Sequence, residues 1–367
     1  MQRVLVSDYS TSGFRKEAQQ SLFEIASETG SALLRHEIVS RNEIDAIIFS
    51  SCSSEQYTAS ILAEMLGIKP KIAVRVDNLC NSGTNAVISG YGLIASGLCK
   101  SALIVGAETQ NSPGRILSWD VTRGSFALPI YWATMYAKNH MRAYGTTEEQ
   151  MATVVVKNRK NASKNPNALF RKKITVDEVM KSKRITEPLK LLDCSSLCTG
   201  ASALLLLSKT MASTRVENPI YITGIGSQTN SASLAEVLSN LNQNGTSKIA
   251  ARDAYKMANV TPKDIDVAEL HDAFSIMEIM AYEDLCFVGR GEGGKFIDQS
   301  AIATNPRGGI LGCGHALGAT GVSQVAEITA QLGDNAGRRQ VEGCKTGLIH
   351  NLSAAGTSAT VLILRAE

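Results

Sequence analysis

The sequence predicts an α/β protein built from two copies of one unit. Two pairs of matching segments support the duplication. EIDAIIFSSCS, from Glu43, matches DIDVAELHDAF, from Asp264, because each begins with an acidic residue and Ile-Asp and continues into a short apolar strand. CSSLCTGASALLLLSKT, from Cys194, likewise matches HNLSAAGTSATVLILRAE, from His350. Both pass from small polar residues into branched apolar residues, which predicts a strand buried on both faces.

Each copy also contains a helix followed by a strand. In the first copy we expect a helix over 82–98 and a strand over 101–108, and in the second a helix over 317–332 and a strand that begins at Thr346. Alternating helices and strands predict a mostly parallel sheet with helices on its faces. The two copies together predict five layers, with two buried helices facing each other between two sheets.

The first copy carries an insertion that the second lacks. We therefore expect a first half over 1–110 and 189–215, an inserted loop domain over 111–188, and a second half over 216–367. The insert is helical by its periodicity and strongly basic towards its end. Inserts of this kind commonly carry loops that bind ligands.

Composition and charge exclude several classes of protein. Lys plus Arg total 37 against 34 for Asp plus Glu, so the charge gives no electrostatic argument for nucleic acid. No stretch approaches the roughly eighteen consecutive apolar residues of a membrane span, and the first residues hold no apolar block of signal-peptide length. We expect a cytoplasmic protein that binds neither nucleic acid nor membrane. The eight cysteines and five histidines are scattered, which predicts free thiols and no metal site.

One thiol has unusual neighbours. Cys80 lies in the polar stretch VDNLCNSGT, directly before the first central helix, whereas a cysteine used for packing usually has aliphatic neighbours. The helix dipole and a nearby imidazole would lower the pKa of such a thiol. We expect Asn78, Asn81 and Ser82 to form a polar mouth, and Gly83 to let a substrate approach the backbone. We interpret Cys80 as a nucleophile, and a buried structural thiol is the alternative.

Two histidines accompany this thiol. His315 lies in GCGHALGATG, a glycine-rich turn that leads into the second central helix and, by the repeat, faces the Cys80 turn. A capped core histidine is the alternative for His315, although glycines crowd both sides of it more than packing requires. His271, in LHDAF, follows a strand and precedes another helix. We interpret Asp272 as a structural residue that caps this helix or orients a neighbour.

Five motifs give the sequence a family resemblance over nearly its full length. They are NLCNSGTNA, YGTTEEQMATVVVKNRKNASKNP, HDAF, NPRGGILGCGHALGATG and QVEGCKTGLIHNLSAAGTS. In this order they resemble the thiolase superfamily, specifically its sterol-carrier-protein-2-like and archaeal acetyl-CoA acetyltransferase type. The resemblance implies the thiolase fold, in which duplicated βαβαβαββ halves form a five-layer αβαβα architecture.

The resemblance implies an acetyl-CoA C-acetyltransferase, or acetoacetyl-CoA thiolase, with a ping-pong mechanism. Cys80 takes an acyl group from a coenzyme A thioester, and then either an acetyl-CoA enolate attacks the acyl group in a Claisen condensation or free coenzyme A removes it by thiolysis. His315 takes the thiol proton, and His271 donates to the thioester oxygen as the enolate forms. The backbone N–H groups of Cys80 and of the Ser353 region form a second oxyanion site.

The sequence departs from the family pattern at the second catalytic cysteine. Many thiolases carry it in a Cys-x-Gly near the C-terminus, and sterol-carrier types carry it in His-Asp-Cys-Phe. The corresponding residues here are 351–353 and Ala273. Cys313 and His350 are candidates for a replacement acid or base. A buried bystander is the alternative for Cys313, and strand alternation is an argument against His350.

Two other functions stay open. A Cys-His-His set resembles that of decarboxylating ketoacyl synthases, in which loss of carbon dioxide generates the carbanion. A catalytically silent acyl-CoA-binding subunit of a thiolase complex is the second alternative, because archaeal-type thiolases occur with an OB-fold (DUF35-type) partner and sometimes with an HMG-CoA synthase. The resemblance also implies a homodimer or homotetramer, formed through the first-half sheet.

The resemblance makes acetyl-CoA, acetoacetyl-CoA and coenzyme A substrates, and we expect no cofactor. The sequence carries no phosphate loop or dinucleotide fingerprint. A basic stretch in the insert is a candidate for contacting the nucleotide phosphates, and a solvated basic face is the alternative. Its residues are Lys157, Arg159, Lys160, Lys164, Arg171, Lys172 and Lys173. We expect the insert to form the wall of the acyl pocket, near Phe126, Met135 and Tyr136.

Overall fold

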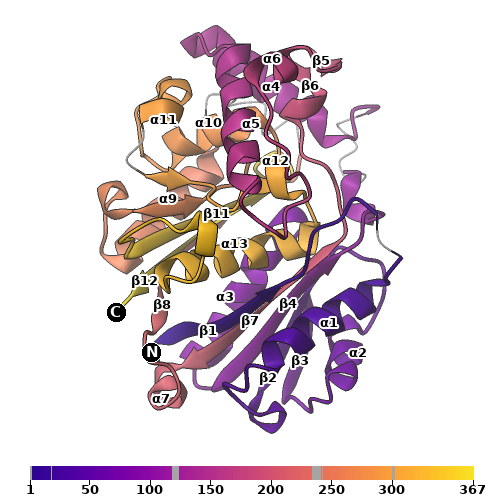
Figure 1. The fold of residues 1–367 in the computed structure, drawn as a ribbon, viewed down its shortest axis with the longest axis vertical. Helices are drawn as coiled ribbons and strands as arrows, with labels where there is room; N and C mark the ends of the chain where they lie inside the picture. The colour runs from indigo at the N-terminus through magenta and orange to yellow at the C-terminus, as the bar shows by residue number, and fades with distance from the viewer. Residues whose placement is uncertain (1, 18, 118–123, 234–240, 242, 300–301) are drawn as a thin grey trace.

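Among the described residues, each predicted half contributes five strands to a ten-stranded sheet. The computed structural model describes residues 2–17, 19–117, 124–233, 241, 243–299 and 302–367 (Figure 1), so part of the predicted insert, 118–123, lies outside the described residues. The strands of the first half are β1 (Val4–Thr11), β2 (Ala46–Ser50), β3 (Ile72–Val76), β4 (Ser101–Glu108) and β7 (Gly200–Ser208). Those of the second half are β8 (Ile220–Thr229), β9 (Val267–Glu269), β10 (Ala303–Thr304), β11 (Thr346–Ser353) and β12 (Ser358–Ala366).

Strand order and direction repeat between the halves. The order is β3-β2-β4-β7-β1 in the first half and β10-β9-β11-β12-β8 in the second. In each half the first three strands of this order run parallel and the others pair antiparallel. The prediction of a mostly parallel sheet is therefore wrong, because β7 pairs antiparallel with β4 and β12 pairs antiparallel with β11. A short antiparallel pairing of Leu5 with Tyr221 and Val6 with Ile220 joins the halves into one ten-stranded sheet.

Helices cover the outer face of each half. α1 (Leu22–Leu34) and α2 (Thr58–Met65) pack on the first half. α9 (Gly245–Ala258) and α10 (Ser275–Asp284) pack on the second half. With the central helices between the halves, each half has the order β-α-β-α-β-α-β-β, and the molecule has the five layers expected.

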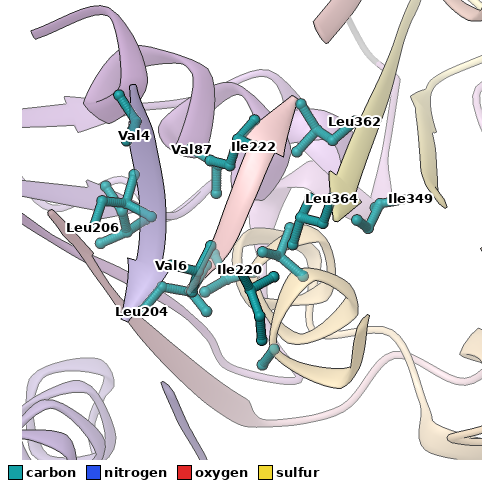
Figure 2. Packing of buried hydrophobic residues seen from close by; sticks show 14 of the residues in the cluster. Val4, Val6, Val87, Leu204, Leu206, Ile220, Ile222, Ile349, Leu362 and Leu364 are labelled. Carbon is teal, nitrogen blue, oxygen red and sulfur yellow. The ribbon is translucent and has the colours of Figure 1, made fainter. Parts of the chain in front are cut away.

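α3 (Ser82–Ala95) and α13 (Leu317–Leu332) form the central layer. Every residue of α13 is buried, and its bounds are those predicted. Figure 2 shows part of the cluster around these helices, in which Val87 of α3 packs together with Leu204 of the first half and Leu362 of the second. The central helices are therefore enclosed by the strands of both halves, which form one continuous sheet rather than the two sheets expected.

The central helices touch through glycines. A Cβ on Gly83 would lie 2.6 Å from the backbone nitrogen of Val322, and one on Gly321 would lie 2.5 Å from the backbone nitrogen of Thr84. Only glycine permits backbones to approach this closely. The contact is at the first turns of α3 and α13, so it brings the loops that precede the two helices together. Gly83 therefore serves helix packing, and its expected role of admitting substrate has no support in the structure.

The insert packs on the second half. It consists of α4 (Pro129–Tyr144), α5 (Glu148–Ala162), α6 (Val176–Met180) and β5 (Arg184–Thr186), which pairs with β6 (Leu189–Lys190). Thr147 and Gln150 form a capping box that begins α5. Trp132 of α4 and Val155 of α5 share a buried cluster with Met277 of α10. The insert therefore forms a cap over one end of the second half (Figure 1).

The described chain also contains short helices. They are α7 (Lys209–Ala212), α11 (Gly293–Gln299) and α12 (Gly309–Cys313). Among the residues that the structure describes, none of the helices combines the length and the hydropathy that crossing a bilayer requires.

Candidate active site

Cys80 lies in a single 3-10 turn, Leu79–Asn81, that leads directly into α3. Leu79 has a φ of +50°, in the left-handed region. Ser82 Oγ accepts a hydrogen bond from the Asn78 backbone N–H at 2.7 Å and donates to the Leu79 carbonyl oxygen at 2.6 Å. These bonds close the turn that holds the thiol.

The asparagines beside Cys80 tie its turn to the second half. Asn78 Nδ2 and Asn81 Nδ2 both donate to Ser358 Oγ on β12, at 3.0 and 2.8 Å. Asn81 is fully buried. The expectation that these two asparagines form a polar mouth for substrate is therefore wrong, because their amide groups donate to another part of the protein. Their role is to fix the position of the Cys80 turn against β12.

The sulfur of Cys80 faces an imidazole from the other half. Cys80 Sγ lies 3.1 Å from His315 Nε2, and His315 Nδ1 lies 2.9 Å from Thr320 Oγ1. The Thr320 hydroxyl donates to the Ala316 carbonyl oxygen at 3.0 Å, so its oxygen accepts from Nδ1–H. Nε2 then carries the lone pair that accepts the thiol proton. Thr320 was not anticipated, since a threonine five residues after a histidine has no recognised signature.

His271 completes a cluster of three functional side chains. Its ring centroid lies 5.5 Å from that of His315, with the rings at 76°. The ligand atoms of Cys80, His271 and His315 all lie within 4.8 Å of one another. The structure therefore brings together the three residues that the sequence motifs selected, and their catalytic roles stay predictions.

Burial keeps this cluster neutral. It raises the pKa of the Cys80 thiol to about 12, lowers the pKa of His315 to about 3, and lowers the pKa of His271 well below its ordinary value. The expected lowering of the thiol pKa is therefore wrong, because desolvation outweighs the favourable contacts of the sulfur. Cys80 rests as a thiol beside a neutral imidazole, so its proton must be transferred during reaction.

Two backbone N–H groups lie near the sulfur. Those of Cys80 and Ala354 lower the pKa of the thiol and so partly offset the effect of its desolvation. Ala354 follows directly after β11 with a φ of +52°, whereas Ser353 pairs with Ser358 in the β11–β12 hairpin. The second donor is therefore the residue after the predicted Ser353. Such a pair of N–H groups is suited to stabilising an oxyanion.

The two candidates for a replacement acid or base lie elsewhere. Cys313 Sγ donates to the Arg307 carbonyl oxygen at 3.1 Å, and Cys313 lines a different cavity of about 100 Å³. His350 Nε2 lies 2.8 Å from Ser247 Oγ on α9, in the outer layer. Strand alternation thus turns His350 away from the Cys80 cluster. Neither residue lines the cavity at Cys80.

Asp272 caps a different helix from the one expected. Its carboxylate accepts from the backbone N–H groups of Ile310 at 2.6 Å and Leu311 at 3.2 Å, in the first turn of α12. It also accepts from Asn158 Nδ2 of the insert at 2.6 Å. Because Asp272 follows His271 and α12 precedes His315, this carboxylate couples the two histidine segments to each other and to the insert.

A cavity of about 250 Å³ opens at Cys80, His271 and His315. The insert supplies apolar wall residues, as expected, but not those predicted. They are Leu117, Leu128, Pro129, Ile130 and Trp132. Tyr136 is instead buried with its hydroxyl donating to the Ala355 carbonyl oxygen at 2.9 Å, and Phe126 is half exposed. Cys194 also lines the cavity, and no motif indicated it.

The predicted basic stretch divides between internal and exposed residues. Lys157 Nζ lies 2.5 Å from Glu278 Oε1, and the Arg159 guanidinium stacks 3.9 Å above the Phe170 ring. Lys157 therefore joins the insert to α10, and Arg159 packs within the insert. The exposed members are Lys160, Lys164, Arg171, Lys172 and Lys173. Their contact with nucleotide phosphates stays a prediction.

A partly buried thiol beside an imidazole, with a second imidazole and nearby backbone N–H groups, is an arrangement suited to an acyl-transferring enzyme. Family models for the thiolase N-terminal domain and the thiolase C-terminal domain-like region match residues 9–210 and 226–366. The chain belongs to the thiolase family, which confirms the predicted thiolase fold and enzyme class.

Individual relatives agree with this assignment. The chain is 36% identical to an acetyl-CoA acetyltransferase of Methanothermobacter thermautotrophicus, over 99% of each chain. It is 34% identical to sterol carrier protein 2 of Oryctolagus cuniculus, over 81% of this chain and 59% of that protein. Among solved structures, the Ltp2-ChsH2(DUF35) aldolase aligns with a TM-score of 0.87 at 23% identity, over 99% of this chain and 98% of that one. The division into halves and insert at 110, 189 and 216 stays a prediction.

Proposed function

We propose that the protein is an acetyl-CoA C-acetyltransferase that works through an acetyl-Cys80 intermediate. The observation that carries the proposal is the 3.1 Å contact of Cys80 Sγ with His315 Nε2, beside two N–H donors. The full-length relative named acetyl-CoA acetyltransferase supports acetyl-CoA and acetoacetyl-CoA as substrates. Coenzyme A is then a substrate, and no cofactor enters the proposal.

The first half-reaction transfers the acyl group to the enzyme. The thiol proton passes to His315 Nε2 as the sulfur attacks the thioester carbonyl carbon. The N–H groups of Cys80 and Ala354 are suited to holding the carbonyl oxygen as it becomes negative. The carbon–sulfur bond to coenzyme A then breaks, and His315 returns the proton to the leaving thiolate. Free acetyl-CoA thus yields acetyl-Cys80 and coenzyme A.

The second half-reaction forms or breaks a carbon–carbon bond. In condensation, an α-proton of a second acetyl-CoA passes to His315 Nε2, which the first half-reaction left neutral, and an enolate forms. The enolate carbon attacks the acetyl-Cys80 carbonyl, the bond from that carbon to Sγ breaks, and the sulfur recovers the proton from His315, which yields acetoacetyl-CoA and free Cys80. Thiolytic cleavage is the reverse. A ring nitrogen of His271 lies within 4.8 Å of Cys80 Sγ, so a substrate on the sulfur would lie beside this imidazole. Burial lowers the pKa of His271 and keeps it neutral, so one ring nitrogen carries a hydrogen that can be donated to the enolate oxygen. A ketoacyl synthase that generates the carbanion by decarboxylation uses the same three residues and is the alternative.

Labelling with substrate tests the proposal directly. Incubation with acetyl-CoA, followed by intact-mass and peptide analysis, is expected to show one acetyl group on Cys80 and none in Cys80→Ser. A silent subunit would remain unmodified. Supplying acetoacetyl-CoA with coenzyme A then separates the two enzymes: a thiolase cleaves it, whereas turnover of a malonyl thioester without this cleavage would favour the synthase.

We also propose that the protein assembles with other chains. The structurally similar Ltp2-ChsH2(DUF35) aldolase supports an OB-fold (DUF35-type) partner, and an HMG-CoA synthase is a further candidate. A second copy is favoured by edge strand β3 and the adjoining face of α2. Tyr57, Ile61 and Met65 recur every fourth residue on that face and are 79%, 37% and 48% exposed. The expected cytoplasmic location stays a prediction.

Light scattering tests the self-association. We expect a dimer or tetramer for the native chain, and Ile61→Glu with Val74→Glu should shift it to a monomer. Asp253→Asn, on the exposed surface of α9, is the matched control and should leave the mass unchanged. A native chain that already measures as a monomer would contradict this part of the proposal.

A further inference from the structure

The candidate active site has the side chains of a metal centre. Cys80 supplies a sulfur, and His271 and His315 supply one nitrogen each, all within 4.8 Å of one another. A search of the described residues for three or more Cys, His, Asp or Glu side chains with ligand atoms this near to one another finds this group. Thiolate and imidazole are ligands that select Zn²⁺ and similar soft or borderline cations. The scattered positions of these residues along the chain gave no sign of this.

We propose that Cys80, His271 and His315 bind Zn²⁺ and that this metal inhibits the enzyme reversibly. The cation would take the place of the thiol proton, so Cys80–SH and Zn²⁺ give a zinc thiolate and a released proton. While the metal holds the sulfur, the sulfur is not free to attack an acyl thioester. The site extends beyond the proposed acetyl transfer, and its occupation does not depend on turnover.

The distances suit a tetrahedral cation after small side-chain movements. Zn–S bonds of about 2.3 Å and Zn–N bonds of about 2.0–2.1 Å place tetrahedral ligand atoms roughly 3.3–3.6 Å apart. Cys80 Sγ and His315 Nε2 are already 3.1 Å apart. The other two pairs of ligand atoms lie within 4.8 Å of each other. A rotation of the His271 side chain that moves its ring nitrogen by on the order of 1 Å would bring all three atoms to tetrahedral spacing.

A hydrogen bond prepares one ligand for the metal. Thr320 Oγ1 donates to the Ala316 carbonyl oxygen and therefore accepts from His315 Nδ1–H, which leaves the Nε2 lone pair facing the sulfur. Metal-ligating histidines commonly donate their second nitrogen in this way, which fixes the tautomer and the ring orientation. The same bond that serves proton transfer thus also serves metal binding.

The cavity leaves a fourth coordination position accessible. The three ligands lie at one end of the space of about 250 Å³, and the rest of its wall is mainly apolar. Water or an added thiol can therefore complete the coordination. Three protein ligands with one open position is the coordination of catalytic rather than structural zinc sites. A chelator can bind at the open position, so we expect it to remove the metal.

Cadmium absorbance tests the site without requiring activity. Titrating the full-length protein with Cd²⁺ is expected to give an ultraviolet thiolate-to-metal band that saturates at one equivalent. Cys80→Ser should abolish the band, and His271→Ala should weaken binding by about tenfold or more. Cys286→Ser, which removes an exposed thiol, is the matched control and should bind as the native chain does.

Inhibition is measured on the same preparation. Zn²⁺ should block alkylation of Cys80 by iodoacetamide, and a chelator should restore it. A cadmium band that survives in Cys80→Ser, or one that is lost in Cys286→Ser, would overturn the proposal. Because absorbance and alkylation need no turnover, failure of acetyl transfer would leave these results interpretable.

Discussion

Thr320 determines which nitrogen of His315 faces the nucleophile. Its hydroxyl is held by the Ala316 carbonyl oxygen, so only its lone pair is available to the imidazole. The thiol and the imidazole are both neutral, because burial raises the pKa of Cys80 and lowers that of His315. In the proposed mechanism, reactivity depends on transferring one proton across the 3.1 Å contact between Cys80 Sγ and His315 Nε2. Two predictions follow from that transfer.

Removing the Thr320 hydroxyl should slow acylation. Thr320→Val leaves His315 Nδ1 without an acceptor, and loss of one hydrogen bond of about 1.4 kcal/mol corresponds to about a tenfold lower rate of Cys80 acetylation. Thr320→Ser keeps the hydroxyl and should restore most of the rate. Stopped acetylation reactions, read by intact mass, measure both variants. Equal rates for the valine and serine variants would show that the hydroxyl does not orient His315.

Alkylation of Cys80 should rise steadily with pH. The thiolate is the reactive form, and with a thiol pKa of about 12 its fraction increases about tenfold per pH unit through the neutral and mildly alkaline range. Iodoacetamide labelling from pH 7 to 10, quantified on the Cys80 peptide, should therefore show a logarithmic slope near one. A rate that levels off near neutral pH would instead indicate a thiolate paired with imidazolium.

At the scale of elements, the contact of α3 with α13 positions the two catalytic turns. Gly83 and Gly321 let the helix backbones meet directly at their first turns, where Cys80 and His315 precede them. The Asp272 carboxylate adds a second constraint by capping α12 just before His315. The site geometry therefore rests on helix ends as much as on the functional side chains.

Filling the helix contact should destabilise the protein. In Gly321→Ala the added Cβ would lie 2.5 Å from the Thr84 backbone nitrogen, so the helices must separate, at a cost of about 1–3 kcal/mol. Gly92→Ala is the control, because its Cβ would meet nothing within 4 Å, and it should be neutral or more stable by about 0.5–1 kcal/mol. Chemical denaturation measures both. If the two variants have equal stability, the close contact does not constrain the fold.

The sequence predicted elements better than their arrangement. Helix 317–332 and strand 101–108 have the predicted bounds. The strand is a short, mainly apolar segment, and the helix repeats apolar residues at helical spacing up to Leu332, after which Gly333 follows. The first central helix ends at Ala95 rather than 98, since Gly97 leaves the helix with a φ of +84°. The direction of β7 and β12 was missed, because an apolar run carries no information on which way its neighbour runs. Motifs located Cys80, but the Ala354 N–H is a backbone group with no residue signature.

At the scale of the whole molecule, buried histidines and buried glutamates change the free energy of unfolding in opposite directions as pH changes. Burial lowers the pKa of His350 to about 4 and that of His315 to about 3 from 6.5, so their contribution to stability is lost as pH falls below 6.5. Burial also raises the pKa of Glu108 and Glu269 to about 7, and their contribution has the opposite sign. The pH dependence of the free energy of unfolding is therefore set by the difference between the histidine and glutamate contributions.

One histidine can be isolated from that balance. His350→Gln keeps a partner for Ser247 but cannot be protonated, so relative to the native chain it should gain stability as pH falls from 6.5 to 4, by on the order of 3 kcal/mol. Above pH 6.5 the difference should be constant. Urea unfolding of both proteins at matched pH values measures it, and a pH-independent difference would mean that His350 has the same pKa in the folded and unfolded states.

The division of the nucleophile and its base between two repeats has a consequence for assembly. Cys80 belongs to the first half and His315 to the second, and the pairing of β1 with β8 that links them involves only two residue pairs. A fragment carrying either repeat alone would thus be chemically incomplete. Acetyl-transfer activity would appear only when the two fragments associate. Measuring that activity during refolding would therefore follow the last step of folding, in which the halves dock.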